Sequence, residues 1–292
     1  MKAKKGINQQ SLGDKMKSYA KHPGSFLLLL LVLLAAVLTV GILVYLVVYI
    51  LMRGVPYLKP SLFAWKYTSD NVSMMPAIIN TLSMTVLSLI FSVPFGVGAA
   101  IYLVEYAKKG NKLVGIIRTT AETLTGIPSI IYGLFGMLFF VTYLKWGISI
   151  LAGAATLAIM VLPVIMRTTE EALLCVPDSF REGSFGLGAG KLRTIFKIVL
   201  PSAMPGILSG VILAIGRIVG ETAALIYTAG TVTNVAGITD SGRTLAVHMY
   251  NLSQEGMHTN EAFATAVVLL IMVLGINGLS SLLAKRFEAK KS

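Results

Sequence analysis

The chain has 292 residues, of which 55% are hydrophobic and 13% are charged. The charged share is about half that of a soluble domain and the mean hydropathy is +0.78, so composition excludes an ordinary soluble enzyme and indicates an integral membrane protein. The net charge of +12 does not indicate a nucleic-acid partner, because most Lys and Arg are concentrated in four polar segments without interleaved aromatic residues.

Six apolar segments are long enough to cross a membrane, since about 20 helical residues span about 30 Å of hydrocarbon. Proline and glycine interrupt several of them, which a bundle of neighbouring helices tolerates. The first segment is longer than the apolar core of a signal peptide, so we expect it to be retained. An all-α integral membrane protein with six transmembrane helices is therefore predicted, over residues 25–51, 75–104, 116–143, 148–166, 203–228 and 262–283.

Basic residues predict which side of the membrane each connection faces. Both ends are rich in Lys and Arg, so the N-terminus 1–24 and the tail 286–292 are expected in the cytoplasm. Two ends on the same side require an even number of spans, and six satisfies this. The basic segments 108–118 and 167–197 are also expected in the cytoplasm. The outer segments, which are poor in Lys and Arg, are expected to be 52–74, a short turn at 145–147 and 229–261.

A glycine-rich stretch, "REGSFGLGAGKLRTIFKIVLP" (181–201), resembles a phosphate-binding loop at first sight. A Walker A loop with Gly190 and Lys191 would need glycine at position 185 and a hydroxyl at 192, where the chain has Phe185 and Leu192. The apolar pattern instead predicts a helix, a tight glycine turn and a second helix on the cytoplasmic face. This stretch is therefore expected to dock a partner and not to bind a nucleotide.

Two charged residues fall inside the fifth predicted span. Arg217 and Glu221 are four residues apart and would share one helix face. A charge at the bilayer centre costs roughly 2.5–3.5 kcal/mol on insertion scales, so such residues face a bundle interior or a polar path. The planar fork of Arg suits a tetrahedral oxyanion, and Thr222 adds a hydroxyl. The alternative is a structural pair that joins two helices.

Several segments carry a resemblance to a known family. The stretch 181–201 resembles the EAA loop of ABC-importer membrane subunits, with Gly and Ser where that loop has two alanines. Other segments are similar to the permeases of the phosphate-specific importer, PstA type, over roughly residues 75–285. They are "GRIVGETAAL" (216–225), "TGIPSIIYGLFG" (125–136), "VPFGVGAAIYLVEYA" (93–107) and "RTTEEALLCVP" (167–177).

The resemblance implies the type I ABC importer permease fold with cytoplasmic coupling helices, in the bacterial cytoplasmic (inner) membrane. Residues 75–285 would form the permease core of five helices, with the coupling loop at 167–201. The implied partners are a second homologous permease in a heterodimer, a cytoplasmic ATPase dimer and an extracytoplasmic phosphate-binding protein. The chain would then be a pore-forming subunit and no enzyme. It would bind no cofactor or metal, because ATP and Mg belong to the ATPase.

The resemblance also assigns candidate site residues. The substrate pathway is expected to involve Arg217, Glu221 and Thr222, with Thr125 and Ser129 near a break in the third span. The residues that match the EAA loop, and are expected to couple the chain to the ATPase, are Glu182, Gly183, Ser184, Gly188, Ile198, Leu200 and Pro201.

Other functions are open to a membrane chain of this kind. An ABC permease for another oxyanion, such as sulfate, molybdate or phosphonate, is the nearest alternative, because an Arg in a pore does not choose among oxyanions. An intramembrane enzyme is disfavoured, since His22, His248 and His258 are scattered outside the spans. Glu170 and Glu171 are adjacent and would point about 100° apart on a helix. A gated channel would need no docking loop.

Overall fold

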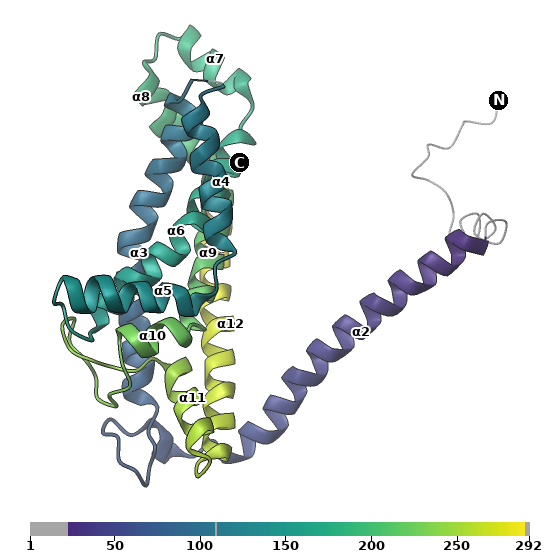
Figure 1. Ribbon diagram of the computed structural model, residues 1–292. Coiled ribbons are helices and arrows are strands. Elements are labelled where there is room, and N and C mark those ends of the chain that lie inside the picture. Colours follow the sequence, from purple (N-terminus) through teal and green to yellow (C-terminus); the bar gives the residue numbers. More distant parts are fainter. Residues whose placement is uncertain (1–22, 109, 290–292) are drawn as a thin grey trace. The chain divides into compact units, whose positions relative to one another are not determined.

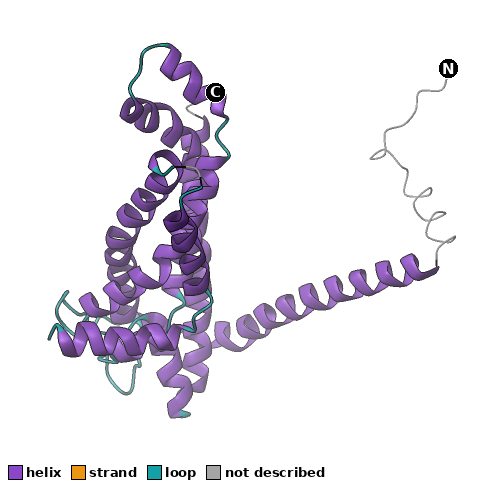
Figure 2. Cartoon of the chain, turned by 45° about the horizontal axis from the view of Figure 1, so that its top comes forward, coloured by secondary structure: helices purple, strands orange, loops and turns teal. Residues whose placement is uncertain are grey.

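The computed structural model describes residues 23–108 and 110–289, with side chains up to residue 282. In this part of the chain all regular structure is helical, as Figure 2 shows, and no strand occurs. The all-α prediction is therefore confirmed. The chain separates into two compact units, Met1–Met52 and Arg53–Ser292, which we describe one at a time.

The described part of the first unit belongs to α2 (Pro23–Gly54), a helix of 32 residues with no charged residue before Arg53. At about 48 Å it is long enough to cross a bilayer, which confirms a span at 25–51. Most of the predicted cytoplasmic N-terminus, and the last residues of the predicted tail, lie outside the described residues.

The second unit is built around α6 (Ile150–Leu174), whose apolar stretch is about two-thirds buried by its neighbours. It contacts α3 (Met75–Ile101) on one side and α9 (Leu200–Val219) on another. Small residues permit this packing: a Cβ atom at Gly153 would lie 2.9 Å from the terminal methyl of Met84 on α3. The helix continues for two further turns beyond the predicted fourth span, 148–166, through a more polar stretch that ends at Leu174.

Two groups of connections gather at opposite ends of the second unit. Figure 1 shows α7 (Asp178–Gly186) and α8 (Lys191–Thr194) at one end, together with the last turns of α12 (Thr259–Ala289). The opposite end carries α11 (Leu245–Glu255) and the start of α3. This is the separation that the basic content of the segments predicts, and the basic end is the one expected to face the cytoplasm.

The predicted outer segment 229–261 is more ordered than a simple loop. It contains α11, and the side chain of Asn80 on α3 ties the preceding loop down. Its amide nitrogen donates to the carbonyl oxygens of Asn234 (2.9 Å) and Arg243 (3.2 Å), and its oxygen accepts from the backbone nitrogen of Ala236 (2.9 Å). A buried amide that satisfies three backbone groups holds this loop against the bundle.

The break expected in the third predicted span, 116–143, is present in the structure. The span consists of α4 (Lys112–Thr125) and α5 (Ser129–Gly136), which continues as a π-helical segment to Tyr143. The two parts are bent by 102° at the break. Pro128 explains the break, since it disfavours a helical conformation at the preceding residue and has no N–H to donate.

The fifth predicted span, 203–228, is also interrupted. Helix α9 ends at Val219, and the short α10 (Ala223–Thr228) begins after three intervening residues. By contrast, Pro94 and Pro163 lie inside α3 and α6 without ending them. With the bent pair α4–α5 taken as one span, the described part of the chain has six candidate spans, as predicted.

Candidate functional site: a docking segment and two helix breaks

The docking segment adopts the predicted helix, turn and helix. Helix α7 ends at Gly186, and Gly188 has φ +80°, which glycine adopts without the steric cost that a Cβ atom would bring. The chain then enters α8 and a π-helical turn, Ile195–Val199, that leads directly into α9. Residues 178–199, the docking segment, thus form a compact connection between the end of α6 and the start of α9.

Large apolar side chains of this segment face outward, although it lies at the polar end of the molecule. Leu187, beside the glycine turn, is 91% exposed. Clustered exposed apolar groups of this kind are typical of a surface that a partner covers. Glu182 and Gly183 are exposed next to them. The other exposed apolar residues are Phe180, Phe185, Leu192 and Phe196.

The remaining residues of the motif pack inside the chain. Ser184 is buried, and its hydroxyl oxygen lies 2.8 Å from that of Thr194, which fastens α7 to α8. Its small size is therefore needed within the turn. Ile198, Leu200 and Pro201 are partly buried where the π-helical turn joins α9. The motif accordingly divides into an exposed part and a part that shapes the segment.

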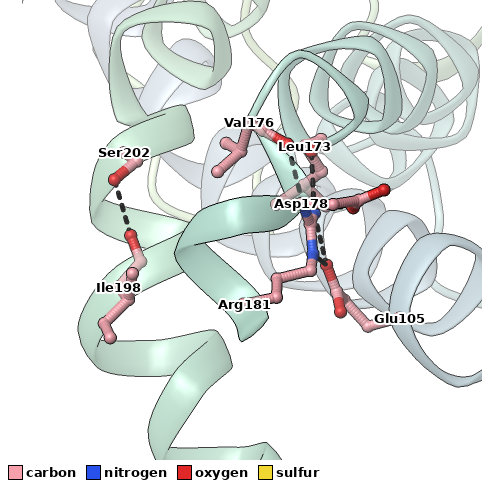
Figure 3. Close-up of polar contacts among 7 residues, drawn as sticks. All are labelled: Glu105, Leu173, Val176, Asp178, Arg181, Ile198 and Ser202. Carbon is pink, nitrogen blue, oxygen red and sulfur yellow. Dashed lines mark hydrogen bonds and ion pairs between the residues drawn. The ribbon is translucent and has the colours of Figure 1, made fainter. Parts of the chain in front are cut away.

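Arg181, which sequence reasoning did not single out, anchors α7. Its guanidinium donates from Nη2 to Glu105 Oε1 (2.8 Å) and to the carbonyl of Leu173 (3.0 Å), and from Nη1 to the carbonyl of Val176 (2.8 Å). Figure 3 shows these contacts converging on one side chain. The sequence signal for this contact was an Arg in the docking motif together with Glu105, the charged residue directly after the apolar segment 75–104.

The two helix breaks lie against each other. A Cβ atom at Gly133 of α5 would lie 2.7 Å from the Cα atom of Ala224 of α10, so the two short helices pack backbone against backbone. The hydroxyl of Tyr132 donates to the carbonyl of Leu124 (2.8 Å), which bridges the bend between α4 and α5. Both breaks therefore belong to one packed region of the bundle.

The prediction that Arg217 and Glu221 share a helix face is wrong. Arg217 occupies the last turn of α9, and the helix ends before Glu221. The Glu221 carboxylate, 9% exposed, accepts from the backbone nitrogen of Ala224 (3.0 Å) and so caps α10. Local capping competes successfully with continuation of the helix, because it satisfies an N–H group that the break leaves free. Within the described part of the chain the two residues form no ion pair.

Arg217 is half-buried, and its guanidinium forms neither a hydrogen bond nor an ion pair with any other described residue. Thr222 begins the turn into α10, and its carbonyl accepts from the backbone nitrogen of Ile226 (3.2 Å). The position of Arg217 at the C-terminal end of α9 favours its positive charge.

Thr125 and Ser129 flank the other break. The Thr125 hydroxyl donates to the carbonyl of Glu122 (2.7 Å), within its own helix, and Ser129 is the first residue of α5. Neither is joined to Arg217 by a hydrogen bond in the part of the chain that the structure describes. The structure brings the two breaks together, but these two hydroxyls are not part of a polar cluster with the guanidinium.

Ion pairs that sequence reasoning missed join α4 to α6. Arg118 contacts the buried Glu170 carboxylate through Nε (2.6 Å) and Nη2 (2.5 Å), and Arg167 contacts Glu122 (2.8 Å). The helices are antiparallel neighbours, so each Arg meets a Glu of the other. These charges are thereby neutralised within the bundle, in contrast to Arg217.

Comparison with known proteins agrees with this architecture. The family model described as "Binding-protein-dependent transport system inner membrane component" matches residues 92–292. A probable ABC transporter permease, YqgI of Bacillus subtilis, is 36% identical over 263 residues, which cover 84% of this chain and 89% of that protein.

A phosphate transport system permease, PstA 1 of Mycobacterium tuberculosis, is 40% identical over 154 residues, which cover 53% of this chain and half of that protein. Among solved structures, a chain of a bacterial alginate ABC transporter is 16% identical, with a TM-score of 0.67 over 92% of this chain and 97% of that one. That likeness shows the fold.

The matches extend over both helix breaks and the docking segment, and each is to the membrane subunit of a transport system. The chain therefore belongs to the family of binding-protein-dependent transport system inner membrane components, as an ABC importer permease of the type I fold in the inner membrane.

Proposed function

We propose that this chain forms half of the translocation pathway of an ATP-driven importer for inorganic phosphate. The observation that carries the proposal is Arg217, a half-buried guanidinium among apolar helices without an ion-pair partner in the described part of the chain. A cation in such a place is costly unless an anion or water reaches it. Relatives that are phosphate transport system permeases support phosphate as that anion.

The capping role of Glu221 strengthens the case for an anion at Arg217. The carboxylate accepts from the backbone nitrogen of Ala224 and forms no ion pair with the guanidinium in the described part of the chain. The five N–H donors of Arg217 remain available for phosphate oxygens, to which an Arg fork donates paired hydrogen bonds. The absence of an ion pair between the two residues in the described part of the chain speaks against the structural alternative, in which they form a joining pair.

The exposed apolar surface around Leu187 supports a separate ATPase as the partner of the docking segment. In the proposed complex an ATPase dimer binds ATP and Mg and meets α7 in the cytoplasm, where both termini of this chain also lie. A second homologous permease completes the pathway. A phosphate-binding protein delivers the substrate to the outer end, at the segment that contains α11.

The first test is phosphate uptake by the reconstituted complex with Arg217→Gln and Arg217→Lys. Losing hydrogen bonds to a charged group costs about 1.5–3 kcal/mol, so Arg217→Gln should lower uptake by about tenfold or more. Arg217→Lys keeps the charge without the fork and should retain part of the uptake. Wild-type uptake by Arg217→Gln, or loss of assembly in both variants, would refute the pathway role.

The second test concerns the choice of anion. An importer for sulfate, molybdate or phosphonate would use the same guanidinium, so competition decides between them. Uptake of labelled phosphate is measured against an excess of each oxyanion and with and without ATP. The proposal is supported if unlabelled phosphate inhibits the uptake and the other oxyanions do not. Stronger inhibition by another oxyanion assigns the chain to that substrate, and uptake without ATP would indicate a channel.

A further inference from the structure

We propose that Arg181 and Glu105 form the mechanical link that carries the movement of α7 to α3 and α6 during the transport cycle. Both act as positioning residues, since neither reaches the helix breaks or the outer surface of the docking segment. The inference rests on the proposed function, because it takes α7 as the helix that meets the ATPase.

One guanidinium joins three elements. Arg181 lies on α7, Glu105 lies in the π-helical turn Tyr102–Tyr106 that follows α3, and the carbonyls of Leu173 and Val176 end α6. Nε also donates to Glu105 Oε1 (3.1 Å), in addition to the bond from Nη2. Figure 3 shows the side chain extending from α7 toward all of these acceptors. A lysine could not reach them together, because its three donors share one nitrogen.

The link is shielded from solvent. The side chains of Arg181 and Glu105 are 14% and 9% exposed, whereas Asp178, which also contacts Arg181 (3.3 Å), is 82% exposed. Exposed ion pairs contribute little and rearrange easily, but buried and hydrogen-bonded charges keep a fixed geometry. The Arg181–Glu105 contact can therefore transmit a displacement, while the Asp178 contact cannot.

The position of this link determines which helices it moves. The opposite end of α7 is fastened to α8 through Ser184 and Thr194, and α8 leads into α9. A displacement of α7 thus reaches α9 along the chain through α8 and reaches α6 along the chain through residues 175–177. Arg181 adds a direct connection to the turn after α3 and to the end of α6. Helices α3 and α6 pack on each other along the bundle, and α6 also packs on α9, so a displacement that enters through Arg181 acts on the centre of the bundle.

The experiment measures coupling in the complete reconstituted complex with Arg181→Gln, Glu105→Gln and the double variant. The quantity is phosphate imported per ATP hydrolysed, together with the amount of ATPase that co-purifies. We expect the amount of associated ATPase to stay unchanged and the phosphate imported per ATP hydrolysed to fall by about fivefold or more. A change of this size corresponds to the lower end of typical coupling energies between two sites. The double variant should equal the single ones, because all three break the same contact.

Arg118→Gln is the matched control. It removes the same charge and also leaves a buried carboxylate, Glu170, without its partner, but it does not touch α7. It should reduce the thermal stability of the complex while the imported phosphate per ATP stays unchanged. An equal fall of the ratio in Arg118→Gln and Arg181→Gln would overturn the proposal, as would an unchanged ratio in Arg181→Gln.

The outcome for the wild-type complex separates this inference from the proposed function. If the wild type hydrolyses ATP but imports another oxyanion, the ratio is measured with that anion and still tests the link. If no ATPase associates with the wild type, the proposed function fails and the link fails with it. If Arg181→Gln alone loses the ATPase, Arg181 belongs to the docking surface and the link is refuted.

Discussion

The close approach of the two helix breaks leads to a quantitative prediction for Gly133→Ala. A Cβ atom at Gly133 would lie 2.7 Å from the Cα atom of Ala224, and ordinary contact begins near 3.4 Å, so α5 and α10 must separate by about 0.7 Å. Overpacking of this kind costs about 1–3 kcal/mol, and Ala in place of a helical Gly returns about 0.5–1 kcal/mol. We expect a net loss of up to about 2.5 kcal/mol.

Gly115→Ala provides the matched control for this measurement. Gly115 lies in α4, and an added Cβ atom meets nothing within 4 Å, so this variant should gain up to about 1 kcal/mol. Thermal unfolding of both purified variants in the same detergent, followed by circular dichroism, gives the comparison. If Gly133→Ala is as stable as Gly115→Ala, the two breaks do not pack against each other, and the described site geometry is wrong.

Two further predictions concern the docking turn and a buried histidine. Gly188→Ala should lose about 1–2 kcal/mol of stability because φ there is +80°, whereas Gly183→Ala in α7 should lose none; melting temperatures of the pair decide this. Burial, and then the charge of Arg243, lowers the pKa of His248 from 6.5 to about 3. Between pH 6.5 and about pH 3 the unfolded chain therefore binds a proton at His248 that the folded chain does not. The stability of the fold is then highest above pH 6.5 and falls by about 1.4 kcal/mol per pH unit below it. His248→Gln should abolish this part of the pH dependence, and unfolding curves of both proteins between pH 5 and 7 that run parallel would contradict it.

The docking segment shows how far local sequence information reaches. The amphipathic pattern and the glycines were sufficient to predict helix, turn and helix, because a positive φ and a short apolar period are local properties. They did not indicate that Ser184 packs against Thr194 or that Arg181 meets Glu105, 76 positions earlier. Such pairs depend on which helix ends meet, and an isolated Arg in a motif does not name its acceptor.

The membrane region illustrates the same division. Sequence alone determined the helical class, the number of candidate spans and their basic connections, because a chain in hydrocarbon must satisfy its own backbone hydrogen bonds and needs about 20 apolar residues to cross. The sequence also indicated the break in the third span, but only the tertiary structure decided that the fifth span breaks after Val219 and how Glu221 is used. Pro94 and Pro163 are tolerated while Pro128 ends a helix, since neighbouring helices determine whether a freed backbone group finds a partner. The donors of Arg217 also depend on tertiary structure, because the carboxylate four residues away lies beyond the end of α9 and accepts from the backbone of α10.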